Sequence, residues 1–118
     1  MKGDTGEILL GKLSSANLNI TTDQLITLSL GNKMITRITC INASGTPALA
    51  AGGVYTGADK SGAAIVAAGQ VYSALTSILG LNLTLAANFV SGSNLYLSLT
   101  TANGSALTCD IYVYGELL

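Results

Sequence analysis

The sequence contains few charged side chains. Charged residues make up 9% of the 118 residues, as five Lys or Arg and six Asp or Glu, against roughly 25% in an ordinary soluble domain. Five scattered cations cannot form the basic patch that binds phosphates, so we expect no nucleic-acid partner. The chain also has no His, the side chain that most often transfers protons near neutral pH. These absences argue against an enzyme, and we expect no catalytic residue, no metal and no cofactor.

Large aromatic side chains are also scarce. The chain has no Trp, one Phe and five Tyr, although hydrophobic residues make up 49% of it. This apolar content is too high, and the net charge of -1 too small, for a disordered chain. The length is that of one domain, and its core must be mainly aliphatic.

Only two cysteines are present, Cys40 and Cys109. They could form a disulfide that closes a long loop, or they could be two buried thiols that pack as small hydrophobic side chains. We favour thiols, because Asp4 and Glu7 lie where an export signal would have its apolar stretch. A zinc site would need two more ligands, and the chain has no His to supply them.

The long uncharged stretch between Lys60 and Asp110 raises the question of a membrane span. Its most apolar window, residues 63–85, contains two Gly and several Gln, Ser, Thr and Asn residues. A span needs about 20 mainly apolar residues, so we expect no membrane partner.

Hydrophobic residues alternate with polar ones along much of the chain. This period of two, typical of β-strands, is seen in residues 24–30, 34–41 and 81–85. Both faces of residues 34–41 are partly apolar, which predicts a central strand covered on both sides. Short strands separated by turns, without alternating helices, predict an all-β fold, as an antiparallel β-sandwich or jelly roll.

The C-terminal third has two well-marked strands. One strand would present Leu95, Leu97 and Leu99 on one face, and the other Leu107, Cys109, Ile111 and Val113. A three-residue loop at residues 102–104, with Gly104 in the left-handed conformation, would form a hairpin that pairs the two apolar faces. Tyr112 and Tyr114 would then share the opposite face with Asp110.

The middle and the N-terminus allow fewer conclusions. Residues 63–79 have helical spacing of apolar residues, but Gly69 weakens a helix, and a strand followed by turns is the alternative. We therefore retain one short helix near residues 64–79 as an option. Residues 1–13 are polar and punctuated by Gly, which predicts an N-terminal arm, and residues 14–118 then form the β-sandwich domain.

Several local patterns could be mistaken for catalytic sites. Residues 52–61 (GGVYTGADKS) lack the adjacent Gly-Lys-Ser/Thr of a phosphate-binding loop and indicate a turn. Lys12, Lys33 and Lys60 could act as bases, but nothing nearby favours this over solvated lysines. The tyrosines could bind sugars, although positions at core edges and contacts between subunits are the preferred interpretation.

Two stretches together resemble a known group of proteins. They are ITRITCINASGTPALAAGGVYTGADKSGAAIVAAGQVYSALT, residues 35–76, and LYLSLTTANGSALTCDIYVYGELL, residues 95–118. They resemble small virion structural proteins of tailed bacteriophages and cover more than half of the chain. The resemblance implies a β-sandwich or jelly-roll protein located in the virion and assembled in the host cytoplasm. It would be a homotrimeric capsid decoration (cement) protein or a related head or tail component.

Function is therefore expected to lie in surfaces. The favoured hypothesis is a decoration protein that binds the major capsid protein, or another virion protein, and stabilises the head as an oligomer. An uncharged, hydroxyl-rich surface would be a solubility risk for a free protein. In an assembly the same surface can be covered by neighbouring subunits, so it suits this role. The alternative is a receptor- or carbohydrate-binding module of a head or tail fibre, which would use tyrosines: Tyr55, Tyr72, Tyr96, Tyr112 or Tyr114.

Overall fold

The computed structural model describes residues 7–118, which form nine β-strands and contain no helix. The all-β prediction is confirmed, and the optional helix near residues 64–79 is wrong. The strands are β1 (Ile8–Asn17), β2 (Gln24–Leu28), β3 (Lys33–Ile41), β4 (Ala51–Gly57), β5 (Ser61–Val66), β6 (Leu81–Asn82), β7 (Phe89–Val90), β8 (Asn94–Thr101) and β9 (Thr108–Leu117).

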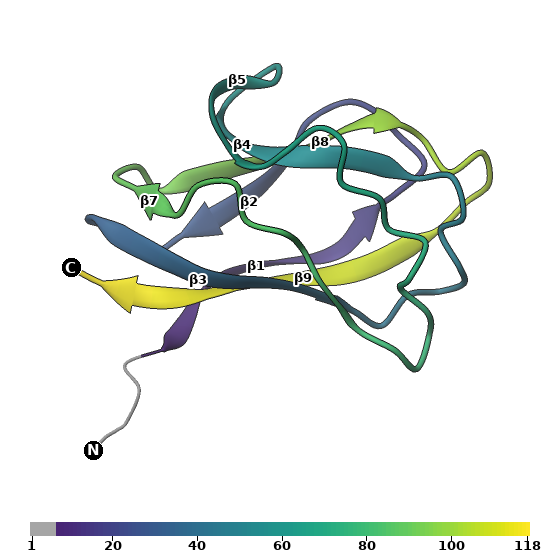
Figure 1. Ribbon diagram of the computed structural model, residues 1–118, viewed down its shortest axis with the longest axis horizontal. Helices are drawn as coiled ribbons and strands as arrows, with labels where there is room; N and C mark the ends of the chain where they lie inside the picture. Colours follow the sequence, from purple (N-terminus) through teal and green to yellow (C-terminus); the bar gives the residue numbers. More distant parts are fainter. Residues whose placement is uncertain (1–6) are drawn as a thin grey trace.

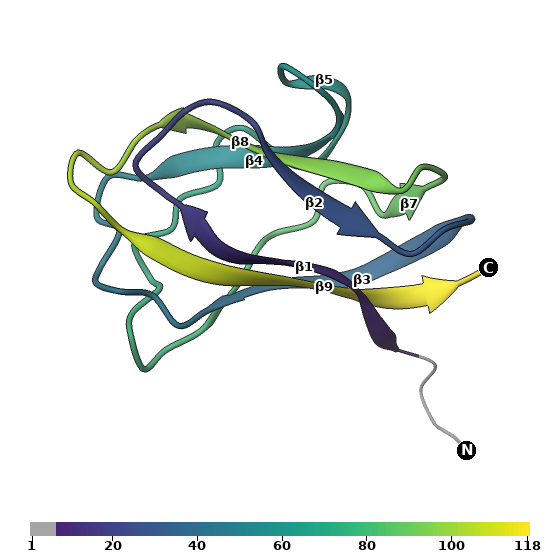
Figure 2. The same ribbon diagram turned by 180° about the vertical axis from the view of Figure 1, so that it is seen from behind.

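The strands form one antiparallel sheet that curls over itself. Its order is β5-β4-β8-β2-β1-β9-β3-β6, and β7 pairs with β3. Strands β4, β8 and β2 lie in one layer, and β1, β9 and β3 lie in the facing layer (Figures 1 and 2). The layers are continuous through the short β1–β2 pairing, so the finer description as a two-sheet sandwich or jelly roll stays a prediction.

Gly11 makes the β1–β2 corner possible. It lies at a register shift in β1 and pairs with Leu28 of β2. A Cβ atom at Gly11 would lie 2.3 Å from the carbonyl oxygen of Thr27, closer than any side chain permits. The missing side chain allows the two backbones to approach where the sheet passes from one layer to the other.

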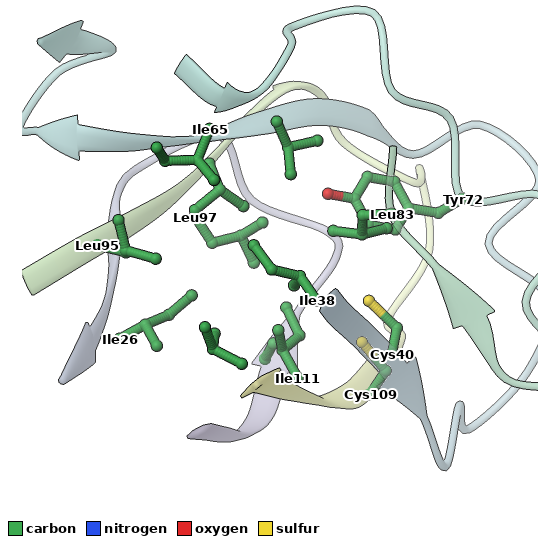
Figure 3. Close-up of a cluster of buried hydrophobic side chains, with 14 of the residues drawn as sticks. Ile26, Ile38, Cys40, Ile65, Tyr72, Leu83, Leu95, Leu97, Cys109 and Ile111 are labelled. Carbon is green, nitrogen blue, oxygen red and sulfur yellow. The ribbon is translucent and has the colours of Figure 1, made fainter. Parts of the chain in front are cut away.

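The core fills the space between the two layers. Ile26, Leu95 and Leu97 come from one layer, Ile38 and Ile111 from the other, and all five are fully buried (Figure 3). The core is thus aliphatic, as predicted, and every one of these residues was on an alternating face in the sequence.

The predicted hairpin between β8 and β9 is wrong in its pairing. β8 pairs with β2 and β4, whereas β9 pairs with β1 and β3. Both apolar faces are buried as predicted, because strands that share a core can face each other across it as well as pair side by side. Gly104 does adopt a positive φ of 93° in the connecting loop.

Residues 67–80 replace the optional helix with turns and bends. Tyr72 and Leu75 are fully buried, which explains the helix-like spacing of the apolar residues. The Tyr72 hydroxyl donates a hydrogen bond to the carbonyl oxygen of Gly52, at 3.1 Å, and the Tyr72 amide donates to Ala50. Contacts with β4 thus hold this segment instead of helical hydrogen bonds.

Two further predictions require correction. Residues 8–13, assigned to an arm, form the first part of β1, where Leu10 is buried and packs in the core; residues 1–6 of that predicted arm lie outside the described residues. β3 is central, but only its inner face is fully buried. A register shift between Ile35 and Arg37 brings Ile35 and Ile38 to the same face.

Residues 81–90 run across the open side of the curled sheet, between β3 and β5. β6 and β7 within this segment pair with β3. On the other side, the Ala86 amide donates to the carbonyl oxygen of Ile65 at the end of β5, at 2.7 Å, and Val66 forms a bridge with Leu85. The segment therefore links the outer strands of the two layers.

Candidate functional site

The outer face of β1, β9 and β3 carries the largest polar and aromatic arrangement in residues 7–118, which we call the tyrosine face. Tyr112 and Tyr114 project from β9, and their rings stack with centroids 6.3 Å apart and an interplanar angle of 15°. The Lys12 ammonium lies over the Tyr112 ring, 5.6 Å from its centroid. The Arg37 guanidinium lies over the Tyr114 ring at 4.0 Å, within the range of cation–π attraction.

Strand register places these groups together. Tyr112 is paired with Lys12 of β1 and Thr39 of β3, and Tyr114 is paired with Arg37 of β3. Directly opposed residues of neighbouring strands share a face. The sequence predicted that Tyr112 and Tyr114 share a face with Asp110, but not that Lys12 and Arg37 lie beside them.

Arg37 is the centre of a polar network on this face. It forms an ion pair with Glu7, with Nη2 and Oε1 2.9 Å apart, and donates to the Thr39 hydroxyl. Thr39 in turn donates to Asn82 at 2.6 Å. Hydrogen bonding from Arg37, followed by that from Thr36, lowers the pKa of Glu7. Arg37 thus serves as a hydrogen-bond and ion-pair partner on a strand face.

Asp110 anchors the far end of the tyrosine face. Its carboxylate accepts a hydrogen bond from the Asn42 amide group at 3.0 Å and from the Ser15 backbone amide at 2.9 Å. Ser15 and Asn42 have positive φ values of 54° and 58°, a conformation that costs free energy in residues other than Gly. Hydrogen bonding from Asn42, then from Ser15, lowers the pKa of Asp110.

A second polar cluster lies on the opposite layer. The Lys60 ammonium donates to the Ser98 hydroxyl at 2.9 Å, and Asp23 accepts from the Asp59 amide at 2.7 Å. Hydrogen bonds from Asp59 and then Ser98 lower the pKa of Asp23. A base beside a serine suggests a nucleophile, but Ser98 is fully buried. The cluster fastens the β4–β5 turn, where Asp59 and Lys60 have positive φ.

The third candidate base, Lys33, is fully buried. Its ammonium donates to the carbonyl oxygen of Gly31, and burial lowers its pKa. The structure therefore separates the three lysines: Lys12 lies on the tyrosine face, Lys60 lies on the opposite layer, and Lys33 lies at one end of the sheet.

The remaining tyrosines do not join the tyrosine face. Tyr72 is fully buried and Tyr55 is 6% exposed, so neither presents a ring to a ligand. Tyr96 lies on β8, paired with Leu25 and Tyr55. Of the five tyrosines predicted as a sugar-binding set, only Tyr112 and Tyr114, both half-buried, form a stacked pair in residues 7–118.

Three shallow surface grooves contain no ionisable side chain. The largest of them, 430 Å³, is lined by residues 67–71 and 84–86. The second, 390 Å³, lies beside β7, and the third, 250 Å³, beside residues 76–80. Residues 7–118 also contain no group of three or more His, Cys, Asp or Glu side chains suited to a metal ion. Ser and Thr hydroxyls line these grooves, but none of the grooves is lined by an acidic or basic side chain that could activate them.

Exposed aliphatic and aromatic side chains gather at the end of the sheet where β1 begins and β9 ends. Leu30 is 83% exposed and Leu118 is 68% exposed. Strand pairing brings the start of β3, the end of β9 and β7 together there, and Figure 1 shows β7 and the C-terminus at the same end. We call the set the apolar end: Ile8, Leu9, Leu30, Phe89, Leu117 and Leu118.

No family model, curated protein or solved structure matches this chain. Within residues 7–118, no helix reaches the length and hydropathy that crossing a membrane would need. The tyrosine face and the apolar end are therefore the two surfaces from which function can be argued.

The apolar end was missed at the sequence level. Leu30 continues the alternation of Ile26 and Leu28, which predicts one face for all three side chains. The strand instead ends at Leu28, and Gly31 turns the chain with a φ of 88°. The alternation alone could not show that Leu30 lies beyond the core.

Proposed function

We propose that this chain is a structural protein of a tailed-bacteriophage virion. In the favoured form it is a capsid decoration (cement) protein that binds the head as a homotrimer and stabilises it by bridging subunits of the major capsid protein. The observation that carries the proposal is the apolar end, where exposed apolar side chains from separate elements meet. Such a patch is costly in water and favourable in an interface.

The composition of the remaining surface supports an assembly role. The described residues contain one ion pair between side chains, Arg37–Glu7, and few charges stand on the rest of the surface. Contacts made by hydroxyl, amide and apolar groups are little affected by salt, because they are not screened as ion pairs are. The resemblance of residues 35–76 and 95–118 to phage virion proteins is the reason for proposing the virion as the location.

The proposal is tested by adding the purified chain to phage heads that lack it. Bound protein is measured by sedimentation, and resistance of the heads is measured by heating them and following DNA release. We expect binding and a higher release temperature. Heads that bind nothing, or that bind the chain without added resistance, would contradict the decoration role.

A matched pair of variants tests the surface that carries the proposal. Leu30→Ser changes the apolar end, whereas Leu25→Ser changes a residue that is 49% exposed on the outer face of β2. We expect Leu30→Ser to weaken binding at least tenfold and Leu25→Ser to leave it nearly unchanged. Light scattering of the free protein measures the oligomer, and a trimer is expected.

A second candidate function rests on the tyrosine face. Paired aromatic rings with amide, carboxylate and hydroxyl groups nearby are suited to sugars or a receptor, so a receptor- or carbohydrate-binding module of a head or tail fibre is the alternative. The rings stack on each other and each has a cation over it, which leaves less free ring surface. A glycan array tests this function, with Tyr114→Ala as the variant expected to abolish any signal.

A further inference from the structure

The two cysteines lie side by side in the core. Cys40 of β3 is paired with Ile111 of β9, two residues from Cys109, so the cysteines are diagonal neighbours on the inner face. Both are free thiols, 0% and 1% exposed. In Figure 3 both sulfur atoms point into the same part of the core, below Tyr72. Hydrogen bonding to Cys109, and then burial, raises the pKa of the Cys40 thiol.

The register brings these two thiols near each other but does not place them in disulfide geometry. Diagonal neighbours on antiparallel strands have Cα atoms about 7–8 Å apart, just beyond the usual disulfide range of about 4.4–6.8 Å. Paired strands already lie about 4.8 Å apart, so the bond needs β3 to shift along β9, which local opening of their pairing permits.

We propose that Cys40 and Cys109 form a dithiol that closes to a disulfide across β3 and β9 when the chain meets a small-molecule disulfide such as glutathione disulfide. One cysteine thiolate attacks a sulfur of glutathione disulfide, whose S–S bond breaks and releases one glutathione. The other cysteine thiolate then attacks the cysteine sulfur of the mixed disulfide and displaces the second glutathione. Two thiols are oxidised, one disulfide is reduced, and the released thiolates take up the two protons.

Burial determines when this reaction occurs. Only a thiolate attacks a disulfide, and both thiols are enclosed by core residues. The native protein therefore reacts slowly, and conditions that open the β3–β9 region speed the reaction. Once formed, the bond closes a loop from residue 40 to residue 109, which restricts the unfolded chain. The inference concerns the fold and is independent of the proposed virion function.

The experiment uses the whole reduced chain and glutathione disulfide. One sample is kept in buffer at pH 8, and a second is held near its urea midpoint and then diluted. Intact mass measures the products: a monomer lighter by two hydrogen atoms is the internal disulfide, and a heavier species carries glutathione. We expect the internal disulfide in both samples, at least tenfold faster in urea. Its melting temperature should exceed that of the reduced protein by roughly 10 °C, and dithiothreitol should reverse the change.

Single variants supply the control. Cys109→Ala should form only a glutathione adduct at Cys40 and show no rise in melting temperature; Cys109→Val replaces it if the alanine variant does not fold. Wild-type protein that ends as glutathione adducts or as disulfide-linked dimers would overturn the proposal. An internal disulfide that forms as fast in buffer as in urea would overturn the part that depends on burial.

Discussion

Replacing Leu97 with Ala tests whether β8 packs across the core onto the facing layer. Its side chain is 0% exposed and lies in the main cluster of buried residues. Leu97→Ala would leave a cavity between two layers of paired strands that can relax only in part. The expected loss in free energy of unfolding is about 3 kcal/mol, within a usual range of about 2–5 kcal/mol. At about 4 °C for each kcal/mol in a domain of this length, the melting temperature should fall by roughly 12 °C.

Leu30→Ala provides the matched control, because the same side chain is 83% exposed there. Its free energy of unfolding should change by less than about 0.5 kcal/mol. Urea and thermal unfolding followed by circular dichroism measure both variants. A loss below about 1 kcal/mol for Leu97→Ala, or equal losses for the two variants, would refute the packing of the two layers.

Three further changes have defined outcomes. Gly115→Ala would place a Cβ atom 2.0 Å from the carbonyl oxygen of Met34 and should cost about 1–3 kcal/mol in urea unfolding, whereas Gly69→Ala has open space and should cost much less. Tyr72→Phe removes the hydroxyl that donates to a buried carbonyl and should cost about 1–2 kcal/mol, measured by thermal unfolding. The pKa of Asp110 lies below its ordinary value of 3.8, so its carboxylate stabilises the fold above that pH, and the contribution is lost as the pH falls through the lowered value. Unfolding at pH 2 to 7 should therefore show a smaller acid loss in Asp110→Asn than in wild type, and equal slopes would contradict the Asp110 contacts.

The sequence was informative about which side chains face inward. Leu95, Leu97 and Leu99 are buried together, as the alternation predicted, because a strand with one apolar face must turn it toward a core. Alternation does not reveal which strand is the neighbour. The strand that carries Cys109 could pair with β8 side by side or face it across the core. Both arrangements bury the same residues.

Register shifts in the strands explain why only part of the tyrosine face could be predicted from the sequence. Tyr112, Tyr114 and Asp110 were expected on one face because they alternate along one strand. Lys12 and Arg37 join them through pairings between residues far apart in the chain, next to register shifts in β1 and β3. A shift of one residue moves every later side chain to the opposite face, and no sequence pattern placed these shifts.

The position of β9 has a consequence for the order of folding. It pairs with β1 on one side and β3 on the other, yet it follows the eight other strands of residues 7–118. During synthesis the edges of β1 and β3 that pair with β9 therefore stay unpaired, and their apolar face stays uncovered, until β9 has left the ribosome. Pairings over such sequence separations form slowly, and chains in this waiting state are prone to associate wrongly. Yield should thus depend on how crowded the nascent chains are, and a lower level of expression should raise the share of chains that fold.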